Sequence, residues 1–347
     1  MTRKLGLCAS KFACRMPMIV VILVAGWAIF FVTTMIPWLE AIQQNIYYLN
    51  HFPLSLHIAP ADTAIYYAGA RELSLSELPM NLLGPTLVYK IFSMNICQVA
   101  VFNLMSLVVA VISVVKLERN VLGWMAICVL INPFLMLNLL PANKELYGAI
   151  CFLYLYGVQK WRSPKLAALA LLYAMLSKYQ LVLFTLFGLL LIGACNDKFR
   201  YALTAAFVLM LTVLQGVETL TYAQMREVLA VASDGSGYST AKLLDTLNVS
   251  YYALPLTVVP KILLYLLDGG AYFFLLHAVI GIAVVFTPGD RVFKLVVLNY
   301  LVFISVVPFV QYRYIGIIYL PLVIMVMSGA KCTFFGVKHG IAGNTGA

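Results

Sequence analysis

The chain has 347 residues, of which 63% are hydrophobic and only 10% charged, whereas a soluble domain carries about a quarter charged residues. This composition excludes a soluble globular protein and indicates a single integral membrane domain over residues 1–347. The formal net charge of +10 does not indicate nucleic-acid binding, because short cytoplasmic loops of membrane proteins collect Lys and Arg.

The apolar runs predict an all-α polytopic protein with about ten transmembrane helices, several of them shorter than the ~20 residues of a full crossing. The turn at Lys178 separates two short spans, so we expect a kink or tilt there. The predicted spans are 17–37, 97–116, 121–140, 145–159, 165–177, 179–195, 201–219, 271–287, 293–310 and 313–329.

Two other apolar stretches, 80–95 and 256–269, are interrupted by prolines and charges. We interpret both as re-entrant or interfacial segments on the outer side, where irregular backbone is tolerated if it lines a cavity. The longest polar stretches, about 38–80 and 220–257, are predicted to be the two outer loops.

The distribution of charge supports an orientation with both termini inside. This threading places on the cytoplasmic side fifteen of the 23 Lys and Arg residues but only three of the 13 Asp and Glu residues. The positive-inside rule requires this bias, and it would be reversed for the later loops if 80–95 crossed the membrane. We therefore expect an integral membrane protein with cytoplasmic termini.

The first polar motif lies in the first outer loop, where Asp62 precedes Tyr66, Tyr67 and Arg71. Asp62 has the position of an N-cap, and it is also a candidate general base or ligand for substrate hydroxyls. The two tyrosines are candidates for stacking on a sugar ring, or ordinary aromatic residues of the membrane interface.

The second motif is Asn143-Lys144-Glu145, at the start of a predicted span. Asn143 suits an N-cap, and Glu145 is favourable in a first helical turn. Neither role explains Lys144, whose charge opposes the helix dipole. A lysine beside a helix N-terminus is well placed to hold an anion such as a phosphate.

Two further motifs carry cations at the predicted outer boundary. Lys178 and Gln180 lie in the turn between short spans, and Arg313 stands between tyrosines before the last span. Lys178 either snorkels to the headgroups or binds substrate. Arg313 is either an anchor in the aromatic belt or a bidentate phosphate ligand.

These motifs together resemble the integral-membrane glycosyltransferases of the GT-C type and the related bacterial polymerases of O-antigen and capsule repeat units. The resemblance rests on Asp62 followed by tyrosine, on Asn143-Lys144-Glu145, on Lys178 with Gln180, and on Arg313-Tyr314. It covers the layout of most of the chain. The paired acidic motif of many such enzymes is missing, since Ala61 precedes Asp62, and we expect neither a metal nor another cofactor.

The resemblance implies a protein of the bacterial inner membrane and a sugar donor carried on a polyprenyl phosphate or diphosphate. The predicted outward position of the motifs agrees, because nucleotide sugars are confined to the cytoplasm. Asp62 is then the catalytic candidate, and Lys144, Lys178 and Arg313 are the candidates for binding the lipid phosphate. Candidates for contacting the sugar or other parts of the substrate are Tyr66, Tyr67, Arg71, Glu145 and Gln180.

Two alternatives belong to other functional classes. One is a flippase of lipid-linked oligosaccharide, which would need a polar path through the bundle; the other is a non-catalytic scaffold of a polysaccharide assembly complex. As partners we expect the polyprenyl-linked sugar, the lipid bilayer and other proteins of polysaccharide assembly, and no nucleic acid.

Overall fold

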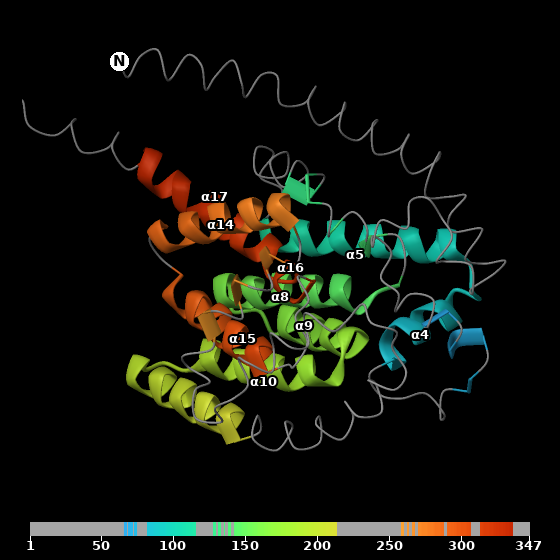
Figure 1. Ribbon diagram of the computed structural model, residues 1–347, viewed down its shortest axis with the longest axis horizontal. Helices are drawn as coiled ribbons and strands as arrows, with labels where there is room; N and C mark the ends of the chain where they lie inside the picture. The colour runs from blue at the N-terminus through green and yellow to red at the C-terminus, as the bar shows by residue number, and fades with distance from the viewer. Residues whose placement is uncertain are drawn as a thin grey trace, which may run out of the picture. The chain divides into compact units, whose positions relative to one another are not determined.

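The computed structural model describes about half of the chain and divides it into two compact units, Met1–Thr185 with Tyr319–Ala347, and Leu186–Ile318. All regular structure in the described residues is helical, without a strand (Figure 1). The described residues do not include Asp62, the predicted span 17–37 or the predicted outer loop 220–257. The described residues are 66–67, 69–71, 73–74, 82–115, 128–129, 131–132, 135, 138–139, 142–213, 258–259, 262–263, 266–267, 270–287, 290–306 and 313–335.

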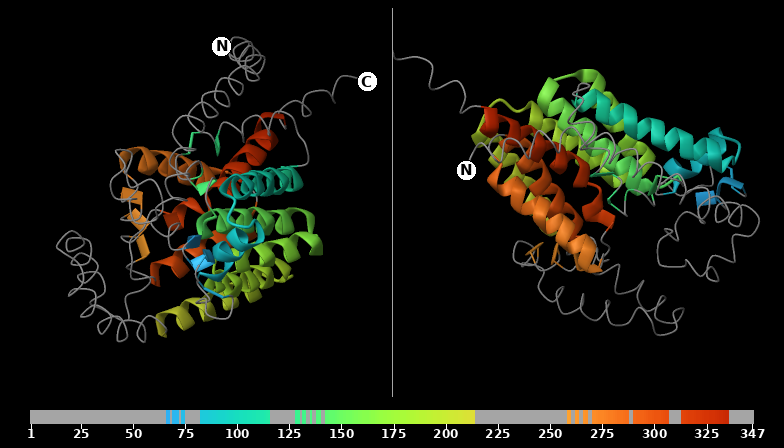
Figure 2. Two further views of the ribbon diagram at one scale, coloured as in Figure 1. Left: turned by 90° about the vertical axis from the view of Figure 1, so that its right-hand side faces the viewer. Right: turned by 90° about the horizontal axis from the view of Figure 1, so that it is seen from above.

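Helix α8 (Lys144–Trp161) is the centre of the first unit. Every side chain from Glu145 to Val158 is buried, as expected for a helix that is apolar on all sides. Helices α5 (Ile96–Val115) and α9 (Pro164–Ser177) pack along it, and the views in Figures 1 and 2 show the three side by side. Helix α17 (Tyr319–Phe335) also contacts α8.

Asparagine side chains begin several helices by accepting a hydrogen bond from a backbone amide of the first turn. Asn95 Oδ1 accepts from Gln98 N at 3.1 Å before α5, and Asn196 Oδ1 accepts from Lys198 N at 2.9 Å before helix 197–213. Asn143 has the same role before α8, which confirms its predicted capping function.

Helices α5 and α8 run in the same direction, as hydrogen bonds near both ends show. Tyr147 Oη donates to Asn103 Oδ1 at 3.0 Å in their first halves, and Trp161 Nε1 donates to the Val114 carbonyl at 3.1 Å at their C-terminal ends.

Helix α9 ends at Ser177 and α10 (Tyr179–Gly193) begins two residues later, so Lys178 alone separates them. Its backbone is extended, with φ −163° and ψ 150°. Its amide still donates to the Ala174 carbonyl at 3.0 Å, and its own carbonyl accepts from Leu181 N at 2.9 Å. The predicted break at Lys178 is confirmed.

The short helix α4 (Leu83–Ile91) lies in the segment interpreted as re-entrant or interfacial. Its 9 residues span about 14 Å at 1.5 Å per residue, well short of the ~30 Å hydrocarbon layer. It packs near the end of α9 (Figure 1), where a Cβ on Gly84 would lie 2.1 Å from the Leu176 carbonyl oxygen. Only glycine permits this approach.

The second unit contains the rest of α10, helix 197–213, α14 (Gly270–Phe286), α15 (Arg291–Val306) and the single turn α16 (Arg313–Gly316). Phe187 stacks on Phe207 at 4.1 Å, and Asn299 Nδ2 donates to Thr204 Oγ1 at 3.2 Å. A turn at 317–318 divides the predicted span 313–329 into α16 and α17.

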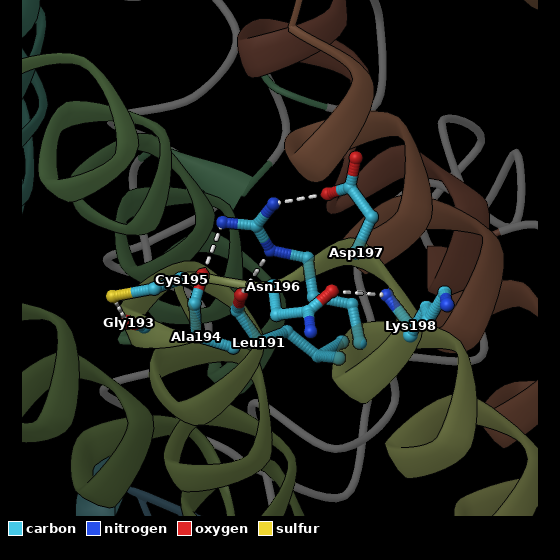
Figure 3. Close-up of polar contacts among 8 residues, drawn as sticks. Leu191, Gly193, Ala194, Cys195, Asn196, Asp197 and Lys198 are labelled. Atoms are coloured by element: carbon cyan, nitrogen blue, oxygen red, sulfur yellow. Dashed lines mark hydrogen bonds and ion pairs between the residues drawn. The ribbon is translucent and has the colours of Figure 1, made fainter.

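Two cations of the second unit close the C-terminal ends of preceding helices, where carbonyl groups lack helical partners. Arg200 donates to the carbonyls of Leu191 and Ala194 at the C-terminal end of α10, and to Asp197 Oδ1 at 2.5 Å. Figure 3 shows this turn. Lys294 Nζ donates to the Thr287 carbonyl after α14 at 2.6 Å. A cation at a helix C-terminus is also favoured by the helix dipole.

Among the described helices, one is both long and apolar enough to cross a membrane, with its window at Gln98–Val115. Four shorter apolar helices cover Pro164–Ser177, Tyr179–Gly193, Gly270–Phe286 and Tyr314–Met327. By length and composition, the described residues therefore establish one candidate span and not the ten predicted.

Candidate functional site

Three of the four predicted motifs meet at the N-terminal end of α8, within the first unit. The Lys144 ammonium lies 5.9 Å from the centre of the Tyr66 ring. Ser177, the residue before Lys178, donates its hydroxyl hydrogen to the Lys144 carbonyl at 2.6 Å. Segments around residues 66, 144 and 177 are thus brought together, as the predicted convergence of the first three motifs requires.

Tyr66 forms a platform beneath Lys144. Its side chain is fully buried, and a cation over an aromatic face at this distance is attracted by the electrons of the ring. Tyr67 is also buried and packs edge-on against Tyr89, with 5.5 Å between ring centres. A sugar that stacked on either tyrosine would have to displace these contacts.

Asn143 and Glu145 organise the first turn of α8. Asn143 Oδ1 accepts from Glu145 N at 3.4 Å, and Asn143 Nδ2 donates to Asn138 Oδ1 at 2.6 Å. The Glu145 side chain is 1% exposed. Burial of a carboxylate is costly, and the amide dipoles of the helix start lower that cost.

Tyr89 is a site residue that the sequence reasoning missed. It reaches from α4, and its hydroxyl oxygen accepts a hydrogen bond from the Ala142 amide at 3.2 Å. Burial raises the pKa of the Tyr89 phenol far above its ordinary value, while the bond from Ala142 acts in the opposite direction. Tyr89 is therefore neutral at physiological pH.

Ser177 stands in the predicted motif of Lys178 and Gln180, but the sequence reasoning assigned it no role because its side chain carries no charge. The available signal was its position immediately before a helix break, where a small hydroxyl residue can bond to a neighbouring backbone. For Tyr89, the signal was Gly84 in the same short segment, since a glycine inside a helical pattern often marks a close backbone approach.

The other candidates have more open positions or lie elsewhere. Lys178 and Gln180 are half-buried at the break between α9 and α10, and Arg71 is exposed in the short helical segment that carries Tyr66. Arg313 opens α16 and belongs to the second unit. Asp62 lies outside the described residues.

The arrangement supplies one cation held over an aromatic ring, a second cation on the adjoining turn, and the start of a long helix. Such a combination suits a phosphate-containing ligand. Within the described part of the chain, no group of three or more His, Cys, Asp or Glu residues is arranged to hold a metal ion. Compared with protein-family models, with curated proteins and with solved structures, the chain matches none.

Proposed function

We propose that the protein is a membrane glycosyltransferase or polymerase of bacterial surface polysaccharide assembly, which takes its sugar from a polyprenyl-phosphate-linked donor. One observation carries the proposal: Lys144 and the turn of Lys178, more than thirty residues apart in the chain, adjoin through the hydrogen bond from Ser177 to Lys144. Two lysines on adjoining backbone segments at a helix start favour a ligand with at least one phosphate.

The proposed topology has about ten spans in the inner membrane, with the cluster on the outer face. It is supported by the parallel course of α5 and α8, since both are predicted to run from outside to inside. Large apolar side chains on α5, α10 and α14 are exposed, including Val101, Leu190 and Phe286. Exposed apolar helix faces of this extent suit contact with lipid.

The proposed reaction is a displacement at the anomeric carbon of the donor sugar. Asp62 removes the proton of the acceptor hydroxyl, whose oxygen forms the new bond to the anomeric carbon. The bond from that carbon to the lipid phosphate oxygen breaks, and the lipid phosphate or diphosphate leaves with the electron pair.

The cations of the site act on this leaving group. Lys144, Lys178 and Arg313 bind the phosphate and stabilise the negative charge that grows on it. Loss of one such contact costs about 3–4 kcal/mol, or roughly 10²–10³ in rate. Tyr66, Tyr67, Arg71, Glu145 and Gln180 are assigned to the sugar and to the shape of the site.

The test is an assay of the purified protein in nanodiscs with a lipid-linked repeat unit and no energy source. We expect new glycosidic bonds, and a loss of about 10²–10³ in rate for Lys144→Met and Arg313→Ala. Asp62→Asn is expected to be inactive. Lys165→Met, an exposed cation on the predicted cytoplasmic side, is the control and should retain full activity.

Each other outcome contradicts the proposal. Full activity of Asp62→Asn and Arg313→Ala would refute the assignment of these residues. Movement of the lipid across the bilayer without bond formation would identify a flippase. An absence of both activities, with all polar motifs tolerant of substitution in cells, would identify a scaffold.

A further inference from the structure

We propose that Tyr89 and Ser177 are positioning residues, which fix the start of α8 from two sides and thereby hold the Lys144 ammonium in place. The effect on sugar transfer rests on the proposed function. The positioning itself does not, because it is a property of the protein without substrate.

The two hydroxyl groups bracket the residues that present the lysine. Tyr89 accepts from the amide of Ala142, and Ser177 donates to the carbonyl of Lys144. Both partners are backbone groups, so the bonds restrain the course of the chain from 142 to 144 whatever side chain it carries. Asn143, between them, is held in turn by Asn138.

The bond of Ser177 differs from those of four other Ser and Thr hydroxyl groups in the described residues. The hydroxyls of Thr185, Thr212, Thr287 and Ser305 donate to the carbonyl four residues earlier in their own helix, which is the usual arrangement. Ser177 instead donates across to a different helix. Its hydroxyl therefore ties the end of α9 to the start of α8.

The two anchors belong to one packed body. Helix α4, which carries Tyr89, approaches the end of α9 so closely at Gly84 that a Cβ there would overlap the Leu176 backbone. Leu176 is the neighbour of Ser177. A displacement of α4 would thus disturb both contacts to the start of α8 at once.

The Lys144 ammonium reports on this positioning, because it lies over the Tyr66 ring. Reductive dimethylation with ¹³C-formaldehyde keeps the lysine charge and adds methyl groups whose NMR shift senses the aromatic ring. The signal of Lys144 is assigned by its loss in Lys144→Arg. Tyr66→Leu then gives its shift without a ring beneath it.

We expect Tyr89→Phe and Ser177→Ala each to move the Lys144 signal toward its position in Tyr66→Leu. Two matched controls remove a similar bond elsewhere. Tyr319→Phe removes the bond from a buried tyrosine hydroxyl to the Cys128 carbonyl, and Ser305→Ala removes a 2.6 Å bond within α15. Both controls should leave the Lys144 signal unchanged.

An unmoved Lys144 signal in Tyr89→Phe and Ser177→Ala, or an equal movement in Tyr319→Phe, would overturn the inference even if the protein transfers sugar. With the lipid-linked donor, each of the two variants should lower kcat on the order of tenfold, the worth of one buried hydrogen bond, with a smaller change in KM. If the signal moves but Lys144→Met transfers sugar at the full rate, the positioning stands and the assignment of Lys144 to the lipid phosphate is wrong. If the signal moves but the unaltered protein forms no glycosidic bond, the positioning stands and the proposed function is wrong.

Discussion

Replacement of Gly84 by alanine tests the packing of α4 against α9. The added Cβ would lie 2.1, 2.4 and 2.6 Å from the oxygen, carbon and Cα of Leu176, all of them backbone atoms. Since no rotamer change can relieve such a clash, the two helices must separate. We expect Gly84→Ala to destabilise the protein by about 1–3 kcal/mol, as overpacking does.

Two other glycines make this prediction a graded series. A Cβ on Gly157 would meet Leu166 Cδ1 at 2.9 Å and Val114 Cγ2 at 3.1 Å, which are side-chain ends able to move. A Cβ on Gly281 meets nothing within 4 Å, so alanine there should stabilise α14 by about 0.5–1 kcal/mol through its higher helix propensity. Gly157→Ala should fall between the two.

Unfolding of the three variants by SDS in mixed micelles, followed by circular dichroism, gives their order of stability. Gly84→Ala should also lower the transfer rate, because α4 carries Tyr89 to the start of α8. If Gly84→Ala is as stable as Gly281→Ala, α4 does not pack on α9 in the way described, and the reasoning on Tyr89 and Ser177 fails with it.

Two further predictions concern helix ends and use the same titration. Asn143→Ala should lower the free energy of unfolding by about 2–3 kcal/mol, because it removes an N-cap and also leaves the buried Asn138 oxygen without its donor. Asn95→Ala removes a cap at an exposed position and should lower it by about 1 kcal/mol. Equal losses in the two variants would contradict the role of Asn138. Arg200→Ala should lower the free energy of unfolding by about 1–2 kcal/mol, because the carbonyls at the end of α10 lose a charged donor. Asp197→Ala should change it by less than about 1 kcal/mol, since the Asp197 side chain is 73% exposed. A greater loss in Asp197→Ala than in Arg200→Ala would show that the ion pair, and not the cap, matters at this turn.

The features of the fold that follow from local chemistry were predictable. The helix break at Lys178 and the cap at Asn143 are properties of a few neighbouring residues, and both are confirmed. The break between α16 and α17 was not predicted, because the sequence from 313 to 329 stays apolar through the turn at 317–318. Hydropathy alone carries no signal for such a turn.

The charged residues of the candidate site were predicted from the sequence, and two of its uncharged residues, Tyr89 and Ser177, were not. Charge made Lys144 and Lys178 conspicuous, and threading the chain through a bilayer placed them on one side. Tyr89 and Ser177 carry no charge, and their roles depend on partners 53 and 33 residues away in the chain. Long-range contacts of this kind follow from packing and not from local pattern.

The interior of the first unit is also more polar than the apolar runs indicated. Asn103 and Asn138 are buried, and Asn103 bonds to Tyr147 between two helices. The bond between Tyr147 and Asn103 holds α5 and α8 together, as interhelical polar contacts do in membranes, and Asn138 accepts from Asn143. Their bonding does not favour the continuous polar path that a flippase needs.

The caps of Arg200 and Lys294 bear on how the protein can be divided. Each cation comes from the helix that follows the one it closes, so α10 is complete only when helix 197–213 is present, and α14 only when α15 is present. A fragment that stopped at residue 195 or 289 would keep an entire apolar helix but lose its C-terminal partner. Split or truncated forms of this protein should therefore be cut between helix pairs and never within one.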